Sequence, residues 1–342
     1  MFLRGINYDV GTYYRKGELS RPEFDEAVIK KELGIIRNEL HCDAVKIIGY
    51  DVSRLSKAAE FALQQGLQVW LTPSHIDATP EEASQHLLEC AIAAENLRLI
   101  YGNIIFVTGF EYSIFLKGFI KGDTIYDRLG QMFSPIGLVM NLLGLRGGVY
   151  RKLNAYLEEV IQTVRTYFKG EVTYASGTWE KVNWELFDFV GIDHYRAAFN
   201  RSTYDKQLEA YYKFNKPIVV MEFGCCAYAG AEDKGPMGWA ITEMLGEKRM
   251  VKEGIKRDES VQANYLTETL DILKQEKVHA AFVFTFINPM YKHDLNPRFD
   301  LDLASYGIVK PVDAVIEGYK GLKWQPKEAF YSLCVYYQQM KP

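Results

Sequence analysis

Two glutamates stand at the ends of apolar stretches that are typical of buried strands. Glu111 follows NIIFVTGF (103–110), and Glu222 ends the apolar run in KPIVVMEFG (216–224). A carboxylate at the end of such a segment is expected where the segment reaches a ligand site. Two carboxyl groups across one pocket can cleave a glycosidic bond, because one protonates the leaving oxygen while the other attacks the anomeric carbon.

The residues around the two glutamates favour different protonation states. Glu111 lies between Phe110 and Tyr112, and an ionised Glu222 nearby would further disfavour its ionisation, which suits a general acid. Glu222 needs hydrogen-bond donors to stay ionised. Strand alternation places Asp193 and Tyr195 on one side of their segment, so the Tyr195 hydroxyl is the predicted donor.

The elements that must position these residues are short apolar strands that alternate with helical stretches. This alternation predicts parallel βα units. Eight strands are predicted, at residues 2–8, 43–50, 67–73, 103–110, 171–177, 187–193, 217–223 and 279–286. The fold class is therefore α/β, a (β/α)8 barrel. A doubly wound open sheet is the alternative, although no G-x-G-x-x-G motif follows the first strand.

Two connections are longer than simple turns require. Residues 112–148 follow the fourth predicted strand, and residues 225–257 follow the seventh. Both leave the C-terminal ends of strands, where barrel enzymes build their sites, so both are expected to wall a pocket. Residues 1–342 are predicted to form a single domain. The apolar segment 132–145 is compatible with a lid, a lipid-like substrate wall or a subunit contact.

Composition excludes several classes of protein. The chain has 342 residues, 48% of them hydrophobic, which is enough for a large core. A formal charge of −4 and the absence of a basic cluster argue against a nucleic-acid partner. The five cysteines have no metal-type spacing and are expected to be reduced thiols of a cytoplasmic protein. No signal peptide and no membrane span are expected.

Several of these segments resemble clan A of the retaining glycoside hydrolases. KPIVVMEFG is similar to the nucleophile strand of that clan, and FDFVGIDHYR (187–196) is similar to the sixth strand of its β-glucosidase branch. RGINY (4–8) resembles the first strand, and SYGIVK with QPKEAFYSL resembles the region after the last strand. The resemblance implies a (β/α)8 barrel with Glu111 as the acid/base and Glu222 as the nucleophile. It also places Tyr195 against the nucleophile.

The chain departs from the clan pattern at three positions. Phe110 stands where the clan has an asparagine that binds the sugar 2-hydroxyl, Lys46 where it has an arginine, and Phe286 where it has a tryptophan. These departures imply either an unusual substrate or the loss of hydrolysis. The expected substrate-binding residues are Lys46, His75, Phe110, Trp179, Asp193, His194, Tyr195 and Phe286. His194 also fits a packed histidine, and the tryptophans also fit the core.

The leading prediction is a retaining glycoside hydrolase that binds a carbohydrate or glycoside and needs no cofactor or metal. A second hypothesis is a barrel that binds carbohydrate without cleaving it, or that serves in phage defence. The run GFEYSIFLKGFIKGDTIYDRL (109–129) is similar to bacterial proteins labelled abortive phage infection proteins. A third hypothesis is a metal-dependent barrel isomerase or hydrolase with Glu111, Glu222, Asp193 and His194 as ligands.

Overall fold

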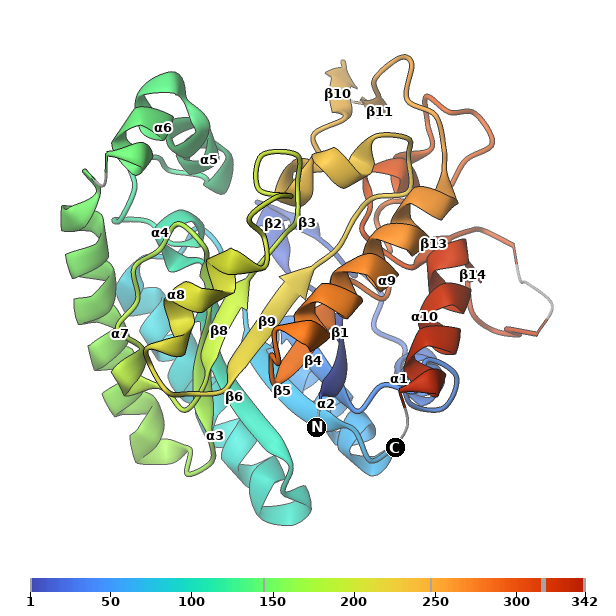
Figure 1. The fold of residues 1–342 in the computed structure, drawn as a ribbon. Helices are drawn as coiled ribbons and strands as arrows, with labels where there is room; N and C mark the ends of the chain where they lie inside the picture. The colour runs from blue at the N-terminus through green and yellow to red at the C-terminus, as the bar shows by residue number, and fades with distance from the viewer. Residues whose placement is uncertain (1, 144, 247, 315–317, 341–342) are drawn as a thin grey trace.

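Eight parallel strands close into a barrel in a computed structural model, which describes residues 2–143, 145–246, 248–314 and 318–340. The strands follow the order β1-β12-β9-β8-β7-β6-β5-β4 around the barrel. Their bounds are β1 Leu3–Asp9, β4 Ala44–Gly49, β5 Gln68–Pro73, β6 Ile104–Phe110, β7 Val172–Gly177, β8 Val190–Asp193, β9 Ile218–Phe223 and β12 Ala280–Val283. The predicted (β/α)8 barrel is confirmed (Figure 1).

Amphipathic helices cover the outside of the barrel. The longer ones are α1 Glu26–Asn38, α2 Val52–Gln64, α3 Pro80–Tyr101, α7 Gly147–Tyr167, α9 Glu259–Gln275 and α10 Glu328–Gln339, and α8 is the short helix Glu209–Tyr212. Thr79 caps α3 through a capping box with Glu82, so the start of this helix is fixed by its own sequence. The connection from β7 to β8 carries only a 3-10 turn, Trp184–Leu186, where a full helix would complete the ring.

The barrel interior is filled by side chains. Trp70 packs against Phe189 and Phe282 with ring centroids 5.1 and 5.3 Å apart. Ile105, Val107 and Val219 belong to the same buried cluster. The interior of the barrel is therefore filled by side chains, and a ligand can enter only from the C-terminal ends of the strands.

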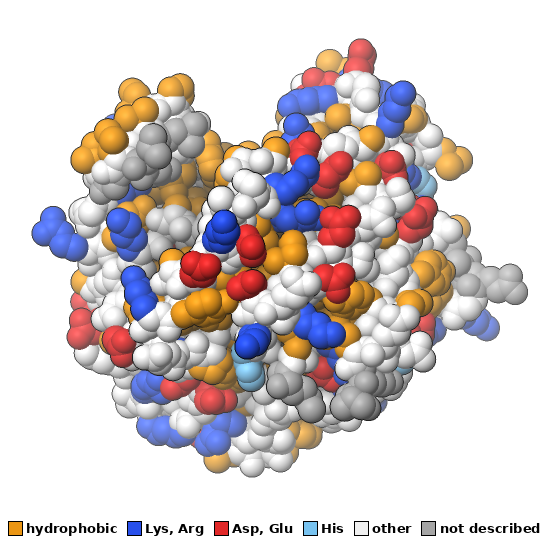
Figure 2. Space-filling view, viewed as in Figure 1, with side chains coloured by type: hydrophobic (Ala, Val, Ile, Leu, Met, Phe, Trp, Pro, Cys, Tyr) orange, Lys and Arg blue, Asp and Glu red, His pale blue; other side chains and the backbone are white. Residues whose placement is uncertain are grey.

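Two long segments rise above those C-terminal ends. The first carries α4 Tyr112–Phe115, α5 Ile125–Phe133 and α6 Pro135–Leu142. The second carries two 3-10 turns and the hairpin of β10 Thr242–Leu245 and β11 Lys248–Val251. They form two lobes on opposite sides of a hollow in the surface (Figures 1 and 2).

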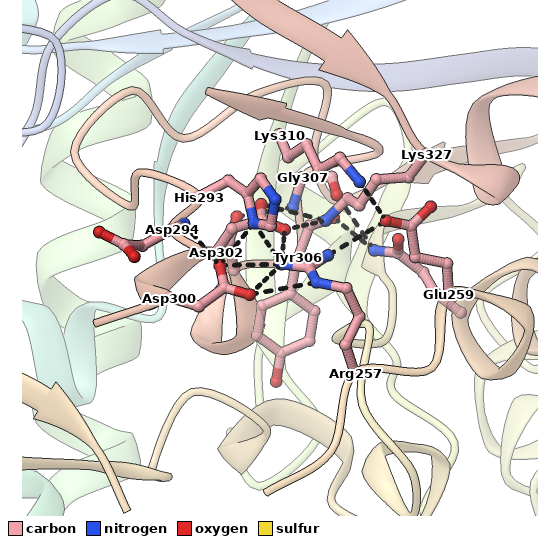
Figure 3. A network of polar contacts seen from close by, with 12 residues as sticks. Arg257, Glu259, His293, Asp294, Asp300, Asp302, Tyr306, Gly307, Lys310 and Lys327 are labelled. Carbon is pink, nitrogen blue, oxygen red and sulfur yellow. Dashed lines mark hydrogen bonds and ion pairs between the residues drawn. The ribbon is translucent and has the colours of Figure 1, made fainter. Parts of the chain in front are cut away.

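Two further small hairpins border the barrel. β2 Tyr13–Arg15 pairs with β3 Glu18–Leu19, and β13 Val309–Pro311 pairs with β14 Trp324–Pro326. The loop between β12 and β13 is held by a charged network (Figure 3). In it, Arg257 contacts Asp300 at 2.7 Å and Asp302 at 3.0 Å, and Lys327 contacts Asp302 at 3.2 Å. This network fixes a loop whose first residues reach the pocket.

Candidate active site

A pocket lies at the C-terminal end of the barrel, between the two lobes. Glu111, Asp193, Tyr195 and Glu222 all line it. The other lining residues come from β1, β4 and β6, from Trp179 after β7, from the β2–β3 hairpin, from both long segments and from the loop after β12. The barrel therefore brings together four residues that are up to 111 positions apart in the sequence, counting from Glu111 to Glu222.

Two donors hold the Glu222 carboxylate. Lys46 from β4 donates to Oε1 at 2.9 Å, and the Tyr195 hydroxyl donates to Oε2 at 3.1 Å. The Lys46 side chain is fully buried, so its ammonium group depends on Glu222 as its counter-charge. Charge-assisted hydrogen bonds of this kind favour the ionised carboxylate and fix its orientation.

Glu111 sits on a sharp turn at the end of β6. Its φ is 40°, which is left-handed backbone that a residue with a Cβ adopts only when its surroundings enforce it. Two residues earlier, Gly109 has a φ of 135°, and a Cβ there would overlap the Tyr112 ring. The turn therefore requires glycine at 109, and it aims the Glu111 side chain at the pocket.

A buried glutamate that the sequence analysis did not identify supports this turn. Glu180 accepts hydrogen bonds from the Ser113 backbone N–H at 2.9 Å and from the Tyr174 hydroxyl at 2.9 Å. The same Tyr174 hydroxyl accepts from the Tyr112 N–H at 2.6 Å. Glu180 follows the end of β7, so its place after a predicted strand was the available signal.

Burial and nearby negative charge govern the ionisation of Glu111. Burial raises the pKa of Glu111 well above its usual range, and the charges of Asp193 and Glu222 raise it further, whereas Lys46 opposes them. Glu111 is thus favoured in its protonated form near neutral pH, as a general acid requires.

Asp193 is the third carboxyl group of the cluster. Among the described residues, neither of its buried oxygens has a hydrogen-bond partner. Burial and the charge of Glu222 raise the pKa of Asp193 well above its usual range, whereas Lys46 opposes them. Asp193 lines the same pocket as Glu111, and its charge disfavours ionisation of Glu111.

Two predicted aromatic residues lie in the pocket. Phe110 is almost fully buried, lines the pocket beside Glu111 and packs edge-on against Phe115 at 4.7 Å between ring centroids. Trp179 lines the opposite side of the same turn and donates its indole N–H to the Ser113 hydroxyl at 3.1 Å. An apolar surface therefore borders the carboxyl cluster where the clan pattern has an asparagine.

Besides Lys46, which contacts Glu222 but does not line the pocket itself, three predicted binding residues do not line it. His194 alternates to the outer side of β8, where it stacks on Tyr204 at 4.0 Å and is nearly fully buried; burial lowers its pKa to about 4. His75 packs between Tyr50 and His86 beyond the end of β5. Both side chains pack against residues outside the barrel strands and do not reach the pocket at the C-terminal end of the barrel.

Phe286 is the third of these residues. β12 ends at Val283, so the strand alternation that the sequence predicts does not continue to position 286. Phe286 is fully buried against Tyr8 and Trp324, and Phe284 lines the pocket in its place. The placement of Phe286 differs from the prediction because β12 ends at Val283. The apolar pattern of the sequence does not show that the strand ends there.

Further pocket residues were absent from the sequence-based prediction. They include Asp9 at the end of β1, Asn288 and Met290 after β12, and Tyr306. The Oδ1 atom of Asn288 is buried and has no hydrogen-bond partner within the described part of the chain. Asp9 stands at a strand end and could have been found by position, whereas the others lie on loops whose course the sequence does not predict.

Two searches of the described residues gave no candidates. No group of three or more His, Cys, Asp or Glu residues in the described ranges is arranged to hold a metal ion. Within the same ranges, none of the helices has the length and apolar character needed to cross a membrane.

A parallel eight-stranded barrel with glutamates at the ends of β6 and β9 has the arrangement that retaining (β/α)8-barrel glycoside hydrolases require. A sequence model of Glycoside Hydrolase Family 113 matches residues 149–294. The matched range contains Asp193, Tyr195 and Glu222, and Glu111 lies before it. This match confirms the prediction of a glycoside hydrolase.

Solved structures confirm the fold. A GH113 beta-1,4-mannanase has a TM-score of 0.62 and 16% identity, with 98% of this chain and 99% of that chain covered. A GH113 beta-mannanase from Alicyclobacillus acidocaldarius gives 0.59 and 15%, with 99% and 98% covered. A beta-glucuronidase from Bacteroides uniformis gives 0.57 and 13%, with 100% of this chain and 36% of that chain covered.

The remaining comparisons are negative. No curated protein matches the sequence. The resemblance of residues 109–129 to abortive phage infection proteins is not supported by the family match or by these structures.

Proposed function

We propose that this chain hydrolyses β-glycosides with retention of configuration, using Glu222 as the nucleophile and Glu111 as the acid/base. One observation carries the proposal. A carboxylate held by Lys46 and Tyr195 lines the same pocket as a carboxyl group whose pKa is raised well above its usual range. Two carboxyl groups with opposite protonation preferences are the requirement of this mechanism.

In the first step, an oxygen of Glu222 attacks the anomeric carbon while Glu111 gives its proton to the leaving glycosidic oxygen. The products are a glycosyl ester on Glu222, a free alcohol and an ionised Glu111. In the second step, Glu111 removes a proton from water, and the water oxygen attacks the anomeric carbon. This releases the sugar and restores both side chains.

Asp193 is a positioning residue in this scheme. Its negative charge favours the protonated form of Glu111 before the first step. After Glu111 has given its proton to the leaving oxygen, the same charge makes Glu111 a stronger base toward water. Lys46 limits the negative charge of the cluster, because its ammonium group lies 2.9 Å from Glu222.

The names of similar structures guide the choice of substrates. They are described as beta-1,4-mannanases and beta-glucuronidases. We therefore propose 4-nitrophenyl β-glycosides of mannose, glucose, galactose and glucuronic acid as the first assays, together with β-1,4-mannan.

The test is the Glu222→Gln variant on whichever aryl glycoside the wild type cleaves. Loss of the nucleophile is expected to lower kcat by roughly 10³-fold or more. Glu158→Gln on the exposed face of α7 is the matched control and is expected to keep full activity. Wild-type turnover by Glu222→Gln would refute the nucleophile assignment.

Phe110 favours one alternative, a barrel that binds carbohydrate and does not cleave it. This side chain lines the pocket beside Glu111 and offers no hydrogen bond to a sugar hydroxyl. Calorimetry with the same glycosides separates the two functions: binding by wild type with no sugar released would support the alternative and contradict hydrolysis.

A further inference from the structure

The pocket is divided into a polar floor and an apolar outer wall. The carboxyl groups of Glu111, Asp193 and Glu222 lie at the strand ends. Farther out, the wall is built from side chains of the two lobes and of the loop after β12: Phe115, Ile125, Leu129, Phe133, Met237, Trp239, Ile287 and Met290. A ligand that fits this pocket has a polar end and an apolar end.

The charged groups of the outer pocket already have partners. Arg15 stacks over Tyr126 at 4.6 Å and donates to its hydroxyl at 3.0 Å. Arg249 forms an ion pair with Glu18 at 3.1 Å. A second sugar in this region would place several hydroxyl groups against apolar side chains, and each hydroxyl left without a partner lowers affinity.

The Tyr306 hydroxyl is also occupied. It donates to the Gly235 carbonyl at 2.6 Å and accepts from the Gly238 N–H at 2.8 Å. The fully buried pocket atoms that lack a hydrogen-bond partner in the described ranges are the Asp193 oxygens and Asn288 Oδ1. They belong to the carboxyl floor and to the loop after β12, so a sugar unit on the floor can satisfy them.

The two lobes beside the hollow also carry exposed apolar side chains. In and after α6, Ile136, Val139, Leu143 and Leu145 are 75%, 52%, 63% and 62% exposed, and Leu245 on the opposite lobe is 67% exposed. Figure 2 shows hydrophobic side chains gathered on the α5–α6 lobe beside the hollow. Apolar surface on a lobe whose helix α5 also lines the pocket favours a ligand that is apolar at its outer end.

The α5 wall is anchored to the barrel. Arg128 of α5 is fully buried, donates to the carbonyls of Ile114 and Gly122, and pairs with Asp77. These contacts join α5 to the segment that follows Glu111. The wall is thus a fixed part of the pocket, which argues against a separate lid.

We propose that the substrate is an amphiphilic glycoside, with one sugar on the carboxyl floor and a long apolar aglycone along the α5 wall. This inference rests on the proposed function. The two steps of that function apply unchanged, and the products are the free sugar and an apolar alcohol. The apolar wall meets the carboxyl floor at Phe110 and Phe115, next to the acid that protonates the leaving oxygen. The aglycone carries that oxygen, so it is the part of the substrate that lies along the wall.

The experiment uses one sugar and a series of leaving groups. Once an aryl glycoside identifies the sugar, methyl, butyl and octyl glycosides of it are compared below their micellar concentrations. Full burial of one methylene group raises affinity about fourfold, and half burial raises it about twofold. The value of kcat/KM is therefore expected to rise on the order of 10²-fold from the methyl to the octyl glycoside. No dependence on chain length, or a preference for a second sugar as the leaving group, would overturn the inference.

Binding to the Glu222→Gln variant separates this inference from the proposed function. If the wall takes the aglycone, the octyl glycoside binds on the order of 10²-fold more tightly than the methyl glycoside, whether or not the wild type turns either over. Equal binding refutes the amphiphilic substrate and leaves hydrolysis intact. Absence of turnover with chain-dependent binding refutes hydrolysis alone.

Leu129→Gln tests the location of the wall. This change is expected to lower the octyl-to-methyl ratio of kcat/KM about tenfold, mainly through KM, because it places an amide against the alkyl chain. Leu99→Gln is the control, since Leu99 lies on α3 away from the pocket and is 70% exposed. A second copy of the chain on the rim would instead give a dimer by light scattering that Ile136→Lys dissolves, and that result would contradict the assignment of the rim to the aglycone.

Discussion

At the scale of single residues, the chemistry depends on how the charge of Asp193 affects the ionisation of Glu111. Burial acts on both carboxyl groups and raises the pKa of each, and the charge of Glu222 adds to this effect. The charge of Asp193 also disfavours ionisation of Glu111. A proton is therefore retained on this pair at a pH where exposed carboxyl groups have lost theirs.

Asp193→Asn is predicted to shift the pH profile of hydrolysis. Removing the negative charge beside Glu111 lowers the pKa of Glu111, and the asparagine amide can also donate to the ionised form. Glu111 then loses its proton at a lower pH than in the wild type. The basic limb of kcat/KM against pH is expected to move toward acid, as measured with an aryl glycoside from pH 4 to pH 9.

Asp193→Glu is the companion variant because it restores a carboxyl group. The basic limb is expected to return toward its wild-type position in this variant. A uniform loss of activity with no movement of the limb in Asp193→Asn would contradict an effect of the Asp193 charge on Glu111 and would assign Asp193 a purely structural function.

At the scale of elements, the strands could be predicted because each is a short apolar run that ends at polar or turn residues. The positions of Glu111 and Glu222 followed from those ends. Their partners did not, since the bond from Lys46 to Glu222 joins residues 176 positions apart and exists only when the barrel closes. The sequence identified Lys46 and Tyr195 as candidates but predicted only the second as a partner of Glu222.

Two of the misplaced residues have a common cause. Phe286 lies beyond the end of β12 and His194 lies on the outer side of β8, and both side chains are buried. Burial alone does not reveal which face of a strand a side chain occupies. β6 and β8 also carry register shifts against their neighbours, between Val107 and Phe110 and between Ile192 and Asp193. Such irregularities re-aim side chains at strand ends without changing the apolar pattern.

Asp302→Asn is predicted to destabilise the loop between β12 and β13. Asp302 and Lys327 are both fully buried, and Asp302 also pairs with Arg257 (Figure 3). Removing the charge of Asp302 leaves the ammonium group of Lys327 buried without its counter-charge. The free energy of unfolding is expected to fall by about 3–5 kcal/mol, measured by urea denaturation.

An exposed ion pair supplies the control for this variant. Lys292 and Asp313 lie 2.7 Å apart, with 62% and 82% of their side chains exposed. Asp313→Asn is expected to leave the free energy of unfolding nearly unchanged, because solvent screens an exposed pair. Equal effects of the two substitutions would show that the buried network does not stabilise the loop.

At the scale of the whole molecule, the pocket concentrates negative charge that folding must accommodate. Glu111, Asp193 and Glu222 line one pocket, Glu180 is buried behind it, and Lys46 is the cation that contacts this cluster in the described structure. Burial raises the pKa of Glu180 as well. The arrangement suits catalysis and opposes stability, which is the usual relation at active sites.

Glu111→Gln is therefore predicted to stabilise the fold in a pH-dependent manner. The raised pKa of Glu111 means that the folded protein binds more protons than the unfolded chain once the pH exceeds the usual range for a carboxyl group. Wild-type stability then decreases as pH rises through the interval up to the raised pKa. Glutamine removes this titration and relieves the repulsion of Asp193.

The difference in unfolding free energy between Glu111→Gln and wild type is expected to be small near pH 4 and to grow toward pH 8. There it is expected to reach about 0.5–2 kcal/mol in favour of the variant, while hydrolysis is impaired. Urea denaturation at pH 4, 6 and 8 measures the difference, with the exposed Glu158→Gln as the charge-matched control. A gain in stability that is independent of pH, or a loss of stability at pH 8, would contradict a protonated Glu111 as the source of the effect. Only the titration of a carboxyl group that is buried in the folded state gives the variant an advantage that appears as the pH rises.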